Sequence, residues 1–185
     1  MSTQPIDQLV KEGEKYPFTE DDLKKLINNK YKLYLYEDLE GINNIEQLLG
    51  ENKGFILLYE VGAEYDGHWI SVFTRPNNTL EIFDPLGLDL DEEIQYSDYQ
   101  VRRHNGAIVP HLTHLVEKSK YKIITNKTKL QESIKDVNTC GRHAGFRIKH
   151  RDLSLEEYVK LFSNKHYTPD WFITILTGHY GSFNE

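Results

Sequence analysis

The sequence predicts an α+β fold in which a central, mostly antiparallel sheet is flanked by helices. Three strand-like runs rich in β-branched and aromatic residues follow one another closely, at 54–61, 68–75 and 79–84. Gaps this short favour an antiparallel meander. From Cys140 onward the apolar residues recur at helical spacing instead. Because 185 residues suffice for one domain with a proper core, we assign residues 1–185 to a single domain.

Capping residues and alternation indicate the other elements of the first half. Residues 1–15 are polar and unpatterned, which predicts a loose N-terminal arm. Thr19 and Asp22 have the spacing of a capping box, so a helix is expected to begin there. We expect a strand at 32–38 and a short helix that ends with Gly at 43–50.

The second half is predicted to be helical around one further strand. Residues 85–107 are acidic and irregular, and Pro110 suits the first turn of a helix. A strand is expected at 121–126. Ser154 and Thr168 then precede two helical patterns as N-caps.

Small residues follow Cys140 at helical spacing. Gly141, Ala144 and Gly145 would give this helix a narrow face. Such a face lets a helix backbone approach its neighbour closely, so we expect the helix to pack tightly against the sheet.

Charge and cysteine content exclude several classes of function. The formal net charge is −7, whereas a nucleic-acid partner requires a basic face. A single Cys cannot form an intrachain disulfide, which suits a reducing compartment. No apolar run approaches the roughly 20 residues of a membrane span, and the N-terminal residues lack a signal-peptide core. We therefore expect an intracellular protein without membrane or nucleic-acid partners.

The single cysteine, Cys140, stands where a helix is predicted to begin. A thiol becomes a nucleophile when its surroundings favour the thiolate or a neighbouring base takes its proton. The positive end of a helix dipole has the first effect. A lone Cys is also commonly a small buried hydrophobe, so its position alone leaves both roles open.

His68 and Asp84 stand at the ends of two neighbouring predicted strands. His68 opens one strand and Asp84 closes the next, so an antiparallel pair would bring them together. A carboxylate in that place fixes the tautomer of an imidazole. The alternative is a strand-end His and an ordinary turn-initiating Asp-Pro.

The remaining histidines carry weaker signals. His111 and His114 lie three residues apart on one predicted helix and could be half of a metal site. No cluster of further ligands completes it, so we expect no metal. Solvated or capping roles are expected for the histidines that follow Cys140, namely His143, His150, His166 and His179.

The order of these residues resembles a known family of proteases. His68-Trp69, Asp84 in "FDPLG" and Thr139-Cys140-Gly141 resemble the adenain-like maturation proteases and the related SUMO and ubiquitin-like proteases. The resemblance covers roughly residues 55–165. The version "TCGRHAGFR" is most similar to proteases of large DNA viruses and virophages, which trim capsid proteins during assembly.

The resemblance implies a papain-like cysteine protease architecture and a role for each matching residue. Cys140 would be the nucleophile, His68 its base and Asp84 the group that orients the imidazole. The oxyanion donor would be Gln131, although it lies nine residues before the Cys (140 − 131), farther than the family donor. Asn138 is the alternative donor.

The resemblance also implies a substrate and a setting. The protein would be an endopeptidase that needs no metal or organic cofactor and cleaves capsid or polyprotein precursors beside small residues, Gly especially. The sequence leaves the oligomeric state open, and a monomer is the expectation. It would act in the virion and the host-cell cytoplasm. Alternatives are a deconjugating protease for SUMO- or ubiquitin-like proteins and a non-enzymatic binding module with an inert Cys. A chymotrypsin-like protease shares the residue order, but the helical run after Cys140 disfavours it.

Overall fold

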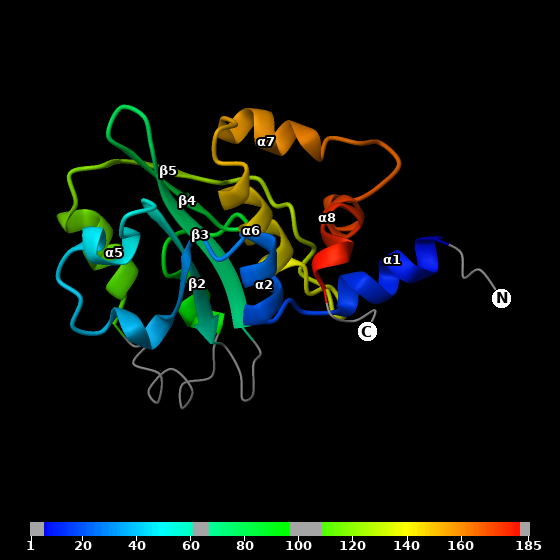
Figure 1. Ribbon diagram of the computed structural model, residues 1–185, viewed down its shortest axis with the longest axis horizontal. Coiled ribbons are helices and arrows are strands. Elements are labelled where there is room, and N and C mark those ends of the chain that lie inside the picture. Colours follow the sequence, from blue (N-terminus) through cyan, green and yellow to red (C-terminus); the bar gives the residue numbers. More distant parts are fainter. Residues whose placement is uncertain (1–5, 61–66, 97–108, 182–185) are drawn as a thin grey trace.

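The computed structural model describes residues 6–60, 67–96 and 109–181 (Figure 1). It confirms the α+β class, with a five-stranded sheet and helices on both of its sides. None of the helices in these three ranges has both the length and the apolar character needed to cross a bilayer. The helices are α1 (Ile6–Lys15), α2 (Glu20–Leu26), α3 (Ile45–Leu49), α5 (His111–Lys118), α6 (Cys140–Lys149), α7 (Leu155–Leu161) and α8 (Pro169–Thr177), with 3₁₀ turns η1 (Tyr36–Leu39), η2 (Glu92–Tyr96) and η3 (Gly178–Tyr180).

The sheet is mixed, with its strands in sequence order. The two inner pairings, β2–β3 and β3–β4, are antiparallel and confirm the expected meander. The two outer pairings, β1–β2 and β4–β5, are parallel, so the expectation of a mostly antiparallel sheet was wrong at both edges. The strands are β1 (Lys32–Leu35), β2 (Gly54–Glu60), β3 (Gly67–Arg75), β4 (Thr79–Phe83) and β5 (Lys122–Thr125).

Connection length explains the two parallel edges. Parallel neighbours need a crossover of a dozen or more residues, usually through a helix. The connection from β1 to β2 contains η1 and α3, and the connection from β4 to β5 contains η2 and α5. The short links around β3 allow only hairpin-like antiparallel pairing.

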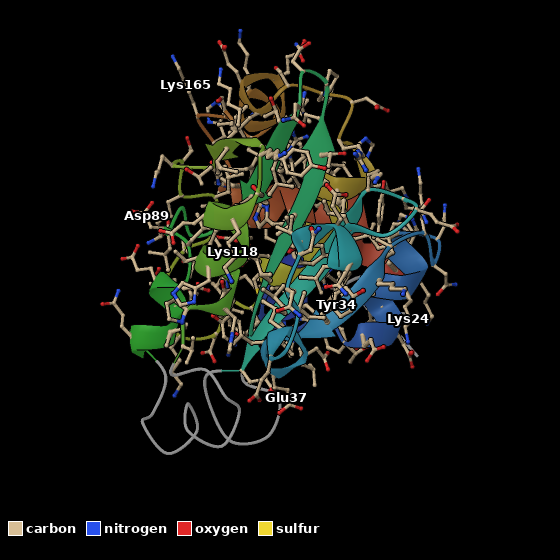
Figure 2. All side chains as sticks on the ribbon, turned by 90° about the vertical axis from the view of Figure 1, so that its left-hand side faces the viewer. Lys24, Tyr34, Glu37, Asp89, Lys118 and Lys165 are labelled. Atoms are coloured by element: carbon tan, nitrogen blue, oxygen red, sulfur yellow. The ribbon has the colours of Figure 1, made fainter. Side chains whose placement is uncertain are left out.

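Helices bury three apolar clusters among the described residues. The smallest joins the end of β4 to α7 and α8 and includes Phe83 and Tyr158, and the other two lie on the two faces of the sheet. One of these two joins β2, β3 and β4 to α3, α5 and η1, and includes Tyr36, Tyr59 and Leu112. The other joins β2 and β3 to α2 and α6, and includes Trp69 and Cys140. Figure 1 shows α5 on one side of the strands and α6 with α8 on the other. Charged side chains of both signs, such as Glu37, Asp89, Lys118 and Lys165, lie on the outside (Figure 2).

The N-terminal arm is a helix over residues 6–15, so the expectation of a loose segment was wrong there. α1 lies beside α8 and buries Val10 and Gly13. Ile6, Leu9 and Val10 recur at helical spacing, a signal that the polar composition of the segment obscured. Residues 1–5 are outside the described part of the chain.

The capping residues begin helices as expected. Thr19 and Ser154 form capping boxes at α2 and α7, and Thr168 caps α8. Pro110 is the N-cap of α5, one residue before the position expected. Within the irregular range 85–107, residues 92–96 form η2, and 97–108 lie outside the described residues.

The expected strand at 32–38 is shorter than its alternating pattern suggests. β1 ends at Leu35, where η1 begins. Asp38 accepts a hydrogen bond from the Leu35 backbone N–H at 2.8 Å, which stabilises the turn over a longer strand.

Two contacts fix α6, the helix that Cys140 begins. At its start a Cβ on Gly141 would lie 3.1 Å from Cδ1 of Trp69, so the absent side chain lets the helix approach β3. At its end Arg147 forms a bidentate pair with Glu81 of β4, with N···O distances of 2.7 and 3.0 Å, and both side chains are fully buried. Gly145 contacts α2 rather than the sheet, because the nearest atoms to a Cβ there belong to Leu26 and Leu23.

Candidate active site

The strand register brings His68 and Asp84 together. Ser71 of β3 pairs with Phe83 of β4, so the start of one strand lies beside the end of the other. Nε2 of His68 lies 2.8 Å from Oδ1 of Asp84, and both side chains are buried. The pairing expected from the sequence is confirmed, and the hydrogen bond orients the imidazole.

Asp84 is itself held in place by backbone and side-chain contacts. Its Oδ1 accepts a hydrogen bond from the Leu86 N–H at 2.7 Å. The buried amide of Asn126 donates to the Asp84 carbonyl at 2.9 Å and to the Thr128 carbonyl at 2.8 Å. Asn126 thereby ties the end of β5 to the end of β4. The sequence pattern did not single it out, because an Asn after a strand is common.

Cys140 is the first residue of α6 and lies beside the start of β3. Its side chain is buried, and Sγ lies 3.9 Å from the carbonyl oxygen of Gly67, the residue before His68. Position at a helix N-terminus favours the thiolate through the helix dipole and the unpaired N–H groups of the first turn. The structure therefore places the cysteine beside the His68–Asp84 pair.

Electrostatics couple His68 to both of its neighbours. Burial opposes protonation of the imidazole, but the Asp84 carboxylate and a hydrogen bond and charge interaction with Cys140 outweigh it. The pKa of His68 is consequently held well above its usual 6.5. Since Nε2 faces Asp84, Nδ1 is the ring nitrogen left for the thiol.

Gln131 lies in the loop that leads from β5 to Cys140. The backbone N–H groups of Leu130 and Gln131 both donate to the Pro85 carbonyl, at 2.8 and 3.0 Å, so this loop is tied to the turn after Asp84. The Gln131 side chain is buried and donates from Nε2 to the Val137 carbonyl at 3.2 Å. Within the described residues its Oε1 has no hydrogen-bond partner. The amide is thus held against the segment that enters α6.

Asn138, the alternative oxyanion donor, is occupied elsewhere. Its exposed side chain donates from Nδ2 to the Lys15 carbonyl at 2.8 Å, and its backbone N–H donates to the Glu14 carbonyl at 2.7 Å. Both contacts lie at the end of α1. The helix that replaces the expected loose arm therefore holds the loop just before Cys140.

Asp170, in the first turn of α8, contacts both ends of the loop between Gln131 and Cys140. Its carboxylate accepts hydrogen bonds from the Thr139 hydroxyl and, at 2.9 Å, from the Glu132 N–H. These partners follow Gln131 and precede Cys140 directly, so one buried carboxylate fixes both ends of the intervening loop. An acidic residue in the first turn of a helix is commonly explained by its favourable interaction with the helix dipole. The sequence therefore did not indicate this contact.

Glu93 is a second buried carboxylate at the imidazole. Its Oε1 lies 3.7 Å from Nε2 of His68, and burial raises the pKa of its carboxyl group, with His68 opposing and Asp84 adding to the rise. Nearby Asp91 accepts hydrogen bonds from the Tyr36 and Tyr59 hydroxyls, each at 2.9 Å, and thereby anchors the segment that carries Glu93. Glu93 lies in an acidic, irregular stretch, so no local pattern distinguishes it from the other acidic residues there.

The remaining histidines differ from their expected roles in one case. His143 is fully buried on α6, so the expectation of a solvated or capping role was wrong for it. Its ring packs edge-on against Phe162, with centroids 5.4 Å apart, and its Nε2 lies 3.5 Å from Asp170. Burial lowers its pKa, Asp170 opposes this, and Arg142 adds to the lowering. His150 caps the end of α6 as expected.

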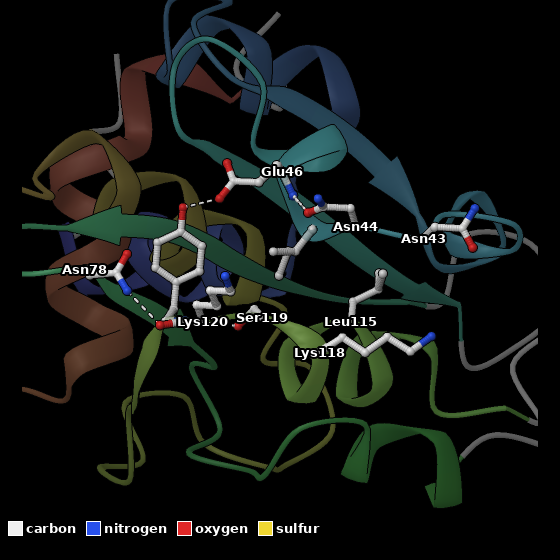
Figure 3. A pocket seen from close by; sticks show the side chains of 10 residues that line it. Asn43, Asn44, Glu46, Asn78, Leu115, Lys118, Ser119 and Lys120 are labelled. Atoms are coloured by element: carbon white, nitrogen blue, oxygen red, sulfur yellow. Dashed lines mark hydrogen bonds between the residues drawn. The ribbon is translucent and has the colours of Figure 1, made fainter.

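A surface pocket of about 380 Å³ lies between α3, α5 and the start of β5 (Figure 3). Its polar groups pair with one another: Tyr121 donates to Glu46, and Asn78 donates to the Lys120 carbonyl at 2.6 Å. None of the candidate active-site residues lines it. The pocket is therefore separate from the His68–Asp84–Cys140 constellation.

Comparison with known proteins identifies a viral relative. The uncharacterized protein V9 of Sputnik virophage is 30% identical over 168 residues, which cover 89% of this chain and 95% of V9. The chain belongs to the V9 family. No protein-family model matches the chain. Membership of the V9 family supports the viral origin that the sequence resemblance implied, and says nothing of activity because V9 is itself uncharacterized.

Proposed function

We propose that this V9-family protein is a viral cysteine endopeptidase with Cys140 as nucleophile, His68 as proton acceptor and donor, and Asp84 as the orienting carboxylate. The observation that carries the proposal is the buried 2.8 Å contact between His68 and Asp84 beside a cysteine that begins a helix. A helix whose N-terminus delivers a thiol to a His at a sheet end is the arrangement that papain-like proteases use. The adenain-type motifs in the sequence point the same way.

The chemistry follows from the two ring nitrogens of His68. The Cys140 thiolate attacks the carbonyl carbon of the scissile peptide while His68 holds the proton. The imidazolium then gives this proton to the leaving amine, and a water molecule hydrolyses the thioester with His68 as base. Asp84 stabilises the imidazolium at Nε2 throughout, in keeping with the raised pKa of His68.

The oxyanion would be held at the start of α6. The backbone N–H of Cys140 belongs to the first helical turn, where N–H groups lack intrahelical partners. The side-chain amide of Gln131 would be the second donor once it leaves the Val137 carbonyl. Asn138 is less suited to this role because its amide is bound to α1.

The substrate class rests on the family and on the resemblance. A virophage relative favours a role in processing virion precursors, and the adenain-like motif implies cleavage beside Gly and other small residues. Trp69, buried directly after His68 and close to Gly141, would shield the His–Cys pair from water.

Mapping of new protein termini tests the proposal. The purified protein is incubated with capsid precursor proteins of its virus and with a peptide library prepared from a whole proteome, beside a Cys140→Ala control. New termini next to small residues that arise only with the unaltered protein support an endopeptidase. Equal cleavage by Cys140→Ala, or none by either protein, contradicts the proposal. Selective release of ubiquitin-like fusions would assign the same residues to deconjugation.

A further inference from the structure

Three buried groups converge at the Nε2 side of the His68 imidazole, the side that contacts Asp84. They are Nε2 of His68, the Asp84 carboxylate and the Glu93 carboxylate, and their nearest atoms all lie within 4.8 Å of one another. Nε2 lies 2.8 Å from Asp84 and 3.7 Å from Glu93. The proposed catalytic role uses the first of these contacts and leaves the second without a function.

Glu93 has an unsatisfied atom in this cluster. Its side chain is only 6% exposed, and its Oε1 has no hydrogen-bond partner within the described part of the chain. A buried polar atom left unpaired costs about 1–3 kcal/mol, so such atoms commonly mark a site for a water, an ion or a ligand. This atom is directed at the same ring nitrogen as Asp84.

We propose that His68, Asp84 and Glu93 form a binding site for a divalent transition metal of the Zn²⁺ type, which switches the proposed peptidase off. One imidazole nitrogen and two carboxylate oxygens are ligands that zinc accepts, and three protein ligands leave a fourth position for water. Metal–ligand distances of about 2.0–2.2 Å in a tetrahedron separate the ligand atoms by roughly 3.3 Å. The separations of 2.8 and 3.7 Å lie on either side of that value.

The charge balance also suits a divalent cation. Two carboxylates neutralise its charge, and the cation removes the repulsion between two acids buried side by side. On binding, Nε2 and the carboxylate oxygens form bonds to the metal, and the proton on Nε2 passes to solvent. His68 then lacks the Asp84-stabilised imidazolium that the thiolate mechanism requires. Release of the metal restores it.

This regulation rests on the proposed function, but the site itself can be measured without it. The obvious competing mode is zinc held by the Cys140 thiolate and Nδ1 of His68, on the opposite side of the ring. The two modes depend on different residues. Loss of Cys140 abolishes the competing mode and leaves the proposed site intact, whereas loss of Glu93 does the reverse.

Calorimetric titration of the full chain with Zn²⁺ separates these modes. The background is Cys140→Ala, into which Glu93→Gln is introduced, with Glu92→Gln as the matched control on the same 3₁₀ turn. We expect one zinc ion to bind Cys140→Ala, at least about tenfold weaker binding after Glu93→Gln, and unchanged binding after Glu92→Gln. Asp84→Asn gives a second, isosteric test should Glu93→Gln unfold, which thermal melting reports.

The outcomes also separate this inference from the function. Zinc binding that disappears with Cys140→Ala, or that survives Glu93→Gln in a folded protein, overturns the site. Zinc binding with the expected pattern supports the site even where no peptide is cleaved, which would overturn the peptidase alone. A peptidase whose rate is indifferent to zinc overturns the switch.

Discussion

At the scale of single residues, the donor to the oxyanion is the assignment with the least support from spacing. Gln131 is nine residues before Cys140 (140 − 131), and the intervening loop turns back at Asp136, whose φ is 70°. Hydrogen bonds at both ends of this loop, to Pro85 and Asp170, still bring the Gln131 amide to the segment that enters α6. The loop thus absorbs the extra residues.

Gln131→Ala should therefore lower kcat about 10²–10³-fold on a substrate found by terminus mapping, with little change in KM. The loss falls on kcat because the donor acts mainly on the charge that develops in the transition state. Asn138→Ala is the matched control and should keep kcat near the unaltered value, since its amide binds Lys15. The assignment is wrong if the two variants exchange these results.

The site residues that could be predicted from the sequence are those at the ends of strands or at the start of a helix. His68, Asp84 and Cys140 stand at the ends of strands and at the start of a helix, and pairing of neighbouring strands alone brings the first two together. Glu93 and Asp170 contact the site through the path of long connections, and that path is not encoded in any local pattern. Their positions follow from packing of segments far apart in the sequence.

At the scale of elements, the contact between α6 and α2 depends on Gly145. A Cβ at this position would lie 2.6 Å from Cδ2 of Leu26 and 3.0 Å from Cδ2 of Leu23, and both leucines are fully buried. The sequence predicted a helix with a narrow face, but not that this glycine would meet another helix instead of the sheet.

Gly145→Ala should lower the free energy of unfolding by about 1–3 kcal/mol, because an added methyl group overpacks the interface. Gly178→Ala is the control: Gly178 is in the right-handed helical region, with φ −56°, and open space surrounds its Cβ position. It should leave stability unchanged or raise it by up to about 1 kcal/mol. Urea denaturation of both variants measures the difference, and equal losses would contradict the contact.

At the scale of the whole molecule, the local parts of the fold were predictable and the long-range pairings were not. The meander of β2, β3 and β4 follows from short links, and the helix starts follow from capping residues. The parallel edge strands β1 and β5 depend on the direction of long crossovers. α1 is stabilised largely by burial against α8, which its polar composition does not reveal.

His143 makes the stability of the whole fold depend on pH. Its folded-state pKa is below 6.5, so the unfolded chain takes up a proton at a higher pH than the folded one. Its contribution is complete above about pH 6.5 and is lost as the pH falls below that value toward its folded-state pKa. Between pH 7.5 and 5.5 the unaltered protein should lose more unfolding free energy than His143→Gln. Parallel pH profiles of the two proteins would contradict this role.

Alkylation of Cys140 tests most directly whether His68 activates its thiol. The chain has one cysteine, so mass spectrometry of the protein treated with iodoacetamide at neutral pH reports this thiol alone. We expect the unaltered protein to react roughly tenfold or more faster than His68→Ala, with Asp84→Asn between them. The Cys140 side chain is only 7% exposed, and His68→Ala opens space beside it. If the thiol were inert and merely buried, this greater access would make the variant react faster than the unaltered protein. Equal or faster alkylation of a folded His68→Ala protein would contradict the account.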